Sequence, residues 1–225
     1  MAEIVIPREI PVMTLSNTVL FPHAMMPLYI FEPRYREMLA YVLDHERVFA
    51  IATVDQEKAA DQNEEPPLPY ASAGIIRACH QNEDGTANLI LQGLCRIHIN
   101  TIVREDPFRV IAIDAMETVS GTDRDTLLTQ HTALRDSLKR LRQVDGETPD
   151  EIFDFLIKID DPEIAYNLCA YTLCNEAEDK HQLLANPNLH SAYKHLLRLI
   201  NDEIRQIKLE RQLRGKLDLG DLGAN

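Results

Sequence analysis

Sequence patterns that carry hydrolytic chemistry are incomplete in this chain. A phosphate-binding loop needs G-x-x-x-x-G-K-[ST], so that backbone amides hold the phosphate groups. The pair Gly215-Lys216 is followed by leucine and has glutamate where the first glycine should stand. His45-Glu46 lacks the second histidine of a zinc-binding H-E-x-x-H helix, and no G-x-S-x-G nucleophile turn occurs. The sequence therefore predicts a protein that is not an enzyme and needs no cofactor.

Cysteine and histidine spacing gives no metal site. His190 and His195 are five residues apart, so they do not share a helical face as two metal ligands would. The four cysteines have no C-x-x-C spacing and are expected to be reduced thiols of a cytoplasmic protein: Cys79, Cys95, Cys169 and Cys174.

The sequence contains residues suited to binding a partner. A proline-rich stretch near the N-terminus holds four large apolar residues: Phe21, Met25, Met26 and Phe31. Methionine makes adaptable, unspecific contacts, which suits the binding of unfolded segments. We therefore predict a polypeptide-binding surface at these residues. The alternative is that they form barrel core, because such apolar residues are usually buried.

Charge limits the classes of partner. Lys plus Arg is 23 and Asp plus Glu is 36, which gives a net charge of −13. A surface of this sign repels phosphate backbones, so nucleic acid is disfavoured as a partner. No apolar run approaches the ~18 residues that would indicate a membrane span, and the N-terminus has no signal-peptide pattern. A basic run near the C-terminus, residues 205–216, is expected to be a solvated helix face; contact with a partner or with nucleic acid is the alternative.

Hydrophobic periodicity divides the chain near residue 120. Before it, apolar runs of strand type alternate with proline and glycine corners and with one helix that opens at Pro33. We expect strands near residues 10–15, 26–30, 48–54, 74–80, 87–99 and 108–116. Residues 55–69 are acidic and rich in proline, and we expect them to form a loop. These elements indicate a small, mostly antiparallel barrel.

After residue 120 the period changes to that of helices. Five helices are expected, and the last keeps apolar spacing from Leu189 to Ile207. We expect an α+β protein with three parts: a β-domain at residues 1–119, a helical domain at 120–214 and a flexible tail at 215–225.

The opening stretch IPVMTLSNTVLFPHAMMPLYIFEPRYREMLAYVL, residues 10–43, resembles the start of the N-terminal domain of Lon proteases. The matching residues are Pro11, Leu15, Val19, Phe21, Pro22, Pro27, Leu28 and Arg34. The likeness returns at residues 74–99, 108–118 and 175–204, in the family's order. The chain departs from the family pattern at Thr14, where proline is usual, and at His23, where glycine is usual.

The resemblance implies a PUA-like pseudo-barrel followed by an all-helical bundle with a long C-terminal helix. It also implies a non-catalytic substrate-recognition module without the ATPase and peptidase domains. Its partner would be an unfolded polypeptide or another protein, and it would act as an adaptor or weak chaperone. An RNA-associated protein is the alternative, since PUA-like barrels resemble RNA-binding modules. The oligomeric state and the identity of the partner stay open.

Overall fold

The computed structural model describes residues 6–62 and 65–221. Within them the chain forms two compact units. The first contains the chain up to Val119 together with Ala170–Pro187, and the second contains Ser120–Cys169 and the chain from Asn188 onward. The first unit is therefore made of two separate pieces of sequence.

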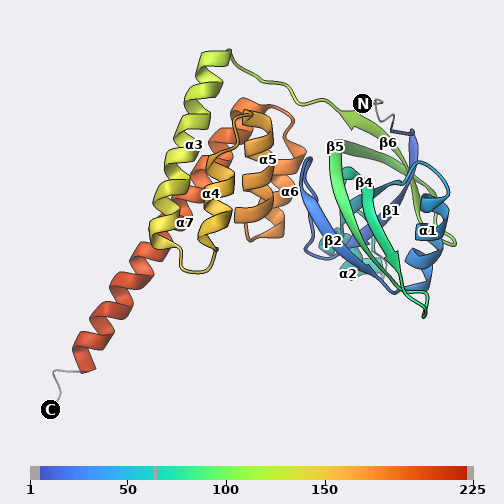
Figure 1. The fold of residues 1–225 in the computed structure, drawn as a ribbon, viewed down its shortest axis with the longest axis horizontal. Helices are drawn as coiled ribbons and strands as arrows, with labels where there is room; N and C mark the ends of the chain where they lie inside the picture. Colours follow the sequence, from blue (N-terminus) through green and yellow to red (C-terminus); the bar gives the residue numbers. More distant parts are fainter. Residues whose placement is uncertain (1–5, 63–64, 222–225) are drawn as a thin grey trace. The chain divides into compact units, whose positions relative to one another are not determined.

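Among the described residues, six strands build the first unit (Figure 1). They are β1 (Glu9–Leu15), β2 (Met25–Ile30), β3 (Val48–Thr53), β4 (Tyr70–Gln81), β5 (Ala87–Arg104) and β6 (Val110–Met116). Their order in the sheet is β2-β5-β4-β3-β1-β6, and β5 also pairs with β6. That extra pairing closes five strands into a barrel and leaves β2 attached to the first half of β5.

All strand pairs are antiparallel except β1 with β3, which is parallel. The interior is filled by small and branched side chains, among them Ile10, Ala50, Ala73, Ile97 and Ile111. Every residue of β3 is buried, because β3 lies between β1 and β4 and is covered on both faces. This explains why its sequence is continuously apolar rather than alternating.

Gly93 lies where β5 crosses from β2 to its pairing with β6. A Cβ atom there would lie 2.0 Å from the carbonyl oxygen of Phe21. The Gly93 N–H donates to the Ala24 carbonyl, and its own carbonyl accepts from the His23 N–H, both at 2.9 Å. Only glycine allows this close approach, which confirms the corner expected at this position.

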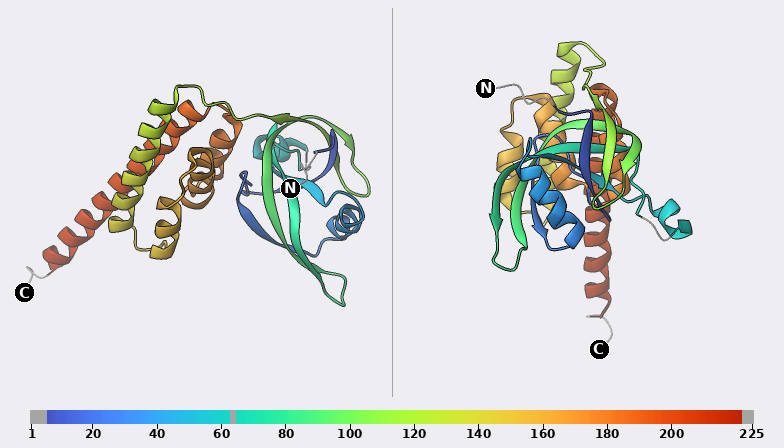
Figure 2. Two further views of the ribbon diagram at one scale, coloured as in Figure 1. Left: turned by 45° about the horizontal axis from the view of Figure 1, so that its top comes forward. Right: turned by 90° about the vertical axis from the view of Figure 1, so that its right-hand side faces the viewer.

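Two helices lie within the strand region: α1 (Pro33–Leu43) and α2 (Gln56–Gln62). Helix α1 lies at the edge of the strands in Figure 1 and in front of them in the right-hand view of Figure 2, and it buries Tyr35, Met38, Leu39 and Val42. Helix α2 occupies part of the segment that we expected to be a loop. Asp55 starts it, because its side chain accepts the backbone N–H of Lys58 at 3.2 Å and pairs with the Lys58 ammonium.

The segment Ala170–Pro187 carries α6 (Ala177–Ala185), which contacts β4. Arg96 of β5 is 2% exposed, and its Nε donates to the carbonyl oxygen of Leu184 at 3.1 Å. Its Nη1 donates to the hydroxyl of Thr118 at 3.2 Å. A buried guanidinium thus holds the end of α6 to the sheet.

The second unit is helical. It contains α3 (Arg124–Val144), α4 (Asp150–Ile157), the first part of α5 (Pro162–Leu173) and α7 (Leu189–Asp221). Helices α3 and α7 share its largest interface, which contains Leu134, Leu138, Leu141, Leu196 and Ile200. Asp123 caps α3 by accepting the Thr126 N–H at 2.9 Å.

The structure confirms the expected α+β class, the mostly antiparallel barrel and the helices with a long C-terminal helix. Helix α7 has 33 residues, so at ~1.5 Å per residue it is about 50 Å long, more than the apolar spacing indicated. The three-part division of the chain stays a prediction. Part of the expected tail, 215–225, falls in α7, and residues 222–225 lie outside the described residues.

Candidate functional site

The four apolar residues of the predicted surface divide into two pairs. Phe21 is fully buried and Met26 is 5% exposed, and both belong to the core of the first unit. Met25 and Phe31 are 48% and 58% exposed. The structure thus places two of these residues where a ligand can reach them and two where it cannot. A binding role for this set stays a prediction.

Alternation along β2 explains why Met25 is exposed and Met26 is buried, whereas Phe21 and Phe31 lie outside this strand. Successive side chains of a strand point to opposite faces, and Met26 and Ile30 point into the unit. Met25, Pro27 and Tyr29 point outward, and Tyr29 is 54% exposed. The rings of Tyr29 and Phe31 stack with centroids 5.8 Å apart. The outer face of β2 is therefore an exposed row of apolar side chains.

Two residues of this row, Pro27 and Tyr29, line a cavity of about 420 Å³ along β2, β5 and β4, which we call the β2–β5–β4 trough. Its lining residues are Pro27, Leu28, Tyr29, Ala78, Cys79, His80, Asn88, Leu89 and Ile90. Strand register brings them together, because Pro27 lies opposite Ile90 and Tyr29 lies opposite Asn88. On the far side of β5, Ile90 lies opposite Ala78.

The trough is nearly uncharged in a strongly acidic protein. The described residues that line it include no carboxylate, lysine or arginine. Arg77 lies next to the trough in sequence and donates from Nε to the Gln92 side-chain oxygen at 2.6 Å. Burial raises the pKa of the Cys79 thiol, which makes it a poor nucleophile. The lining residues thus offer mainly apolar contact area.

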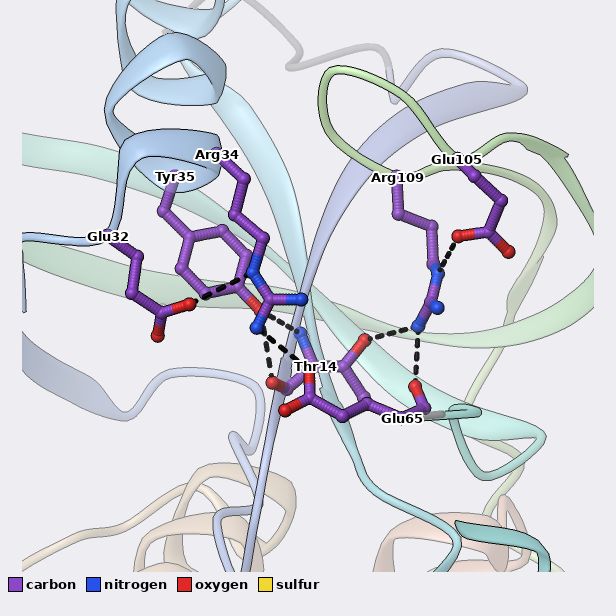
Figure 3. A network of polar contacts seen from close by, with 7 residues as sticks. All are labelled: Thr14, Glu32, Arg34, Tyr35, Glu65, Glu105 and Arg109. Atoms are coloured by element: carbon purple, nitrogen blue, oxygen red, sulfur yellow. Dashed lines mark hydrogen bonds and ion pairs between the residues drawn. The ribbon is translucent and has the colours of Figure 1, made fainter. Parts of the chain in front are cut away.

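A polar network holds the chain directly after Phe31 (Figure 3). Arg34 donates from Nε to Glu32 at 2.9 Å and from Nη2 to Glu65 at 2.8 Å. Arg109 donates from Nη1 to the Glu65 carbonyl at 2.6 Å. Each exposed ion pair contributes little alone, but together they join the start of α1 to the end of the segment that carries α2. The β2–α1 junction is therefore fixed in place.

Thr14 supplies the centre of this network at a position where the resemblance has proline. Its backbone N–H lies 3.3 Å from the Tyr35 hydroxyl, which donates to the Thr14 carbonyl at 3.1 Å. Its side-chain hydroxyl accepts from Arg109 at 3.1 Å. Proline has neither the N–H nor the hydroxyl, so this departure from the family pattern is used structurally.

The arrangement of the described residues gives no evidence for a metal site or a redox-active thiol. In the part of the chain that the structure describes, no group of three or more His, Cys, Asp or Glu residues is placed to hold a metal ion. Burial raises the pKa of Cys95 to about 11, so that thiol is protonated at neutral pH. Within residues 6–62 and 65–221, no helix is both apolar enough and long enough to cross a membrane.

Tyr29, Ile90 and Ala78 belong to the trough and were not among the predicted site residues. Alternation along β2 placed Tyr29 on the same side as Met25 and was a usable signal. Ile90 and Ala78 come together with it only through the register of β5 with its two neighbours, which the sequence alone does not specify.

Comparison with protein families identifies the family of this chain. The model of the "ATP-dependent protease La (LON) substrate-binding domain" matches residues 9–202. The chain belongs to the Lon substrate-binding domain family. Lon protease of Desulfosudis oleivorans is 23% identical over 94% of this chain, and that of Escherichia coli is 21% identical over 93%. The chain spans about a quarter of each relative's length, 26% in both cases.

Solved structures show the same fold. A Lon N-terminal domain protein from Xanthomonas campestris superposes with a TM-score of 0.62 at 20% identity, over 84% of this chain and 97% of that chain. The N-terminal domain of Mycobacterium avium complex Lon protease gives 0.64 at 17% identity, over 86% and 98%. This Lon-type domain therefore has the architecture of isolated Lon N-terminal domains.

Proposed function

We propose that this Lon-type domain is a non-enzymatic polypeptide-binding module that holds exposed apolar segments in the β2–β5–β4 trough. The single observation that carries the proposal is an uncharged, apolar trough bordered by the exposed side chains of Met25, Tyr29 and Phe31. Exposed apolar patches rimmed by polar residues mark binding sites in soluble proteins. Membership of a substrate-binding domain family supports the same assignment.

The cellular role we propose is that of a cytoplasmic adaptor or weak chaperone. Such a protein must bind many sequences without altering them. Methionine and aromatic side chains give adaptable contact area, and the geometry around the trough offers no activated nucleophile. The net charge of −13 favours polypeptide over nucleic acid as the ligand.

The test is fluorescence anisotropy of a labelled, permanently unfolded polypeptide titrated with the purified protein. We expect saturable binding. Met25→Ser, Tyr29→Ser and Phe31→Ser should each weaken it at least about fivefold, the equivalent of ~1 kcal/mol. All three side chains are about half exposed, so the variants should stay folded. Phe21 and Met26 are unsuitable for this test because their truncation would open a cavity in the core.

Phe155→Ser is the matched control, because Phe155 is 57% exposed but lies on α4 of the other unit. Its affinity should equal that of the unaltered protein. Loss of binding in Phe155→Ser, together with full binding in the three β2-side variants, would refute the placement of the site. Absence of any binding by the folded protein would refute the function.

A further inference from the structure

The open edge of β2 offers a second way to bind a polypeptide besides the trough. Among the described strands, β2 pairs with β5 alone, so its other edge is unpaired. Such an edge accepts an added strand when its backbone N–H and C=O groups are free to form a ladder. Whether the edge or the face takes the ligand depends on which residues of β2 direct their backbone groups outward.

The register of β2 with β5 determines which residues of β2 direct their backbone groups to the open edge. The Gly93 N–H donates to the Ala24 carbonyl at 2.9 Å, directly before the Met25–Gln92 pair where the register of β2 with β5 begins. Opposed residues in an antiparallel pair alternate between bonded and non-bonded positions. Met26, Leu28 and Ile30 therefore direct their backbone groups to β5, while Met25, Pro27 and Tyr29 direct theirs to the open edge.

Pro27 stands at the middle of that edge and has no N–H to donate. An added strand would find donors at Met25 and Tyr29 and none between them. Proline at such a position is a known means of protecting an edge strand from further pairing. The edge of β2 is thus a poor template for strand addition.

The outer face of β2, unlike its edge, is well suited to contact with a polypeptide. The side chains of Met25, Pro27, Tyr29 and Phe31 project from every second residue, which gives a repeat of roughly 6.6–6.8 Å. One side of any extended polypeptide has the same repeat. Six residue steps from Met25 to Phe31 span about 20 Å at ~3.3 Å per residue, which matches about seven residues of an extended ligand.

The polarity of the trough lining indicates which side chains the ligand can carry. Ile90 and Ala78 lie side by side across β5 and β4, next to Pro27. With no carboxylate, lysine or arginine among the described lining residues, and His80 as the titratable imidazole among them, the trough offers no permanently charged partner to a charged side chain. A charge buried there would lose hydration without compensation.

Taking the proposed function as its basis, we propose that the β2–β5–β4 trough binds an extended, uncharged segment of about seven residues face-on. Alternate apolar side chains of the ligand lie between the β2 row and Ile90. The ligand backbone does not add a strand to β2.

The test compares two labelled seven-residue peptides with leucine at alternate positions and serine between them. In the second peptide, alternate backbone amides are replaced by esters, which removes N–H donors and leaves the side chains unchanged. Face-on binding predicts affinities within about threefold of each other. A loss of about tenfold or more for the ester peptide would overturn face-on binding while leaving the proposed function intact. Failure of the all-amide peptide to bind would instead count against the proposed function.

Two variants examine the same question from the side of the protein. Pro27→Val supplies the missing donor to the open edge and keeps an apolar side chain, so its affinity should stay within about twofold. A gain of fivefold or more would show strand addition and overturn the proposal. Ile90→Thr keeps a β-branched residue in β5 but puts a hydroxyl in the trough, and it should weaken both peptides about fivefold or more. Unchanged binding in a folded Ile90→Thr variant would also overturn it.

Discussion

At the scale of single residues, the side chains that matter most for the first unit are those that no sequence pattern marks. Arg96 lies on a strand face whose neighbours Gln92 and His98 are more exposed, so the sequence suggests a solvated arginine. The structure buries it because the end of α6 supplies the Leu184 carbonyl, 88 residues away in the chain. A contact of this range depends on tertiary structure and is invisible to periodicity.

Arg96→Met should lower the free energy of unfolding by about 3 kcal/mol. The substitution leaves the Leu184 carbonyl and the Thr118 hydroxyl without the guanidinium they now bind in a buried site. Urea denaturation followed by circular dichroism measures the change. Arg77→Met is the matched control, since Arg77 is exposed and should shift stability by no more than ~0.5 kcal/mol. Equal stability of both variants would show that Arg96 does not hold α6.

His23→Gly should raise stability by up to about 1 kcal/mol. His23 has a φ of 69°, in the left-handed region that glycine adopts without steric cost. The family pattern has glycine at this position, so the histidine is the strained choice. Thermal unfolding measures the gain. His23→Ala keeps a Cβ atom and hence the strain, and it should give no gain; an equal gain from alanine would trace the effect to the imidazole instead.

At the scale of elements, most strands and helices follow from hydrophobic period alone. The buried β3 lies where the apolar pattern predicts it, and α7 begins at the predicted Leu189 but ends beyond Ile207. Helix α2 does not follow from the pattern, because five polar residues and two alanines form no apolar stripe and give no helical signal. Its N-terminus depends on the side chain of Asp55, whose pKa is lowered by the hydrogen bond and charge of Lys58.

The contact between α3 and α7 also contains a titratable group. The ring nitrogens of His131 lie 3.1 Å from the Tyr193 hydroxyl and 3.1 Å from the Ile159 carbonyl oxygen. Burial and the nearby charge of Arg135 lower the pKa of His131 below its ordinary 6.5, although Asp160 and Asp161 act in the opposite direction. The folded helical unit therefore favours the neutral imidazole.

Stability should fall as pH drops below about 6.5. In that range the unfolded chain binds a proton at residue 131 that the folded chain resists, so the contribution of His131 is complete above its ordinary pKa and is lost as pH falls through the folded pKa. Urea unfolding at pH 7.5, 6.5 and 5.5 measures the slope, and His131→Gln should reduce it. An unchanged slope in the variant would assign the effect to other histidines, such as His181, whose pKa is also lowered by burial.

At the scale of the whole molecule, the sequence predicts the strands and helices themselves better than it predicts which of them belong to the same compact unit. The period changes near residue 120, and the first piece of the strand unit ends at Val119. The return of Ala170–Pro187 to the strand unit gives no such signal, because α5 and α6 are ordinary helices in sequence. The trough is hidden for the same reason: its lining residues come from three strands, and each strand contributes only three of them.

The net charge of the protein leads to a prediction that distinguishes polypeptide binding in the trough from association with RNA. A ligand held by apolar contacts in an uncharged trough should bind with nearly constant affinity between 50 and about 500 mM salt, since screening acts only on charges. Single-stranded RNA should show no saturable binding to a protein of charge −13. Anisotropy titrations with both ligands over that salt range measure the difference. A steep loss of RNA binding with rising salt would reveal phosphate contacts and favour the RNA-associated alternative.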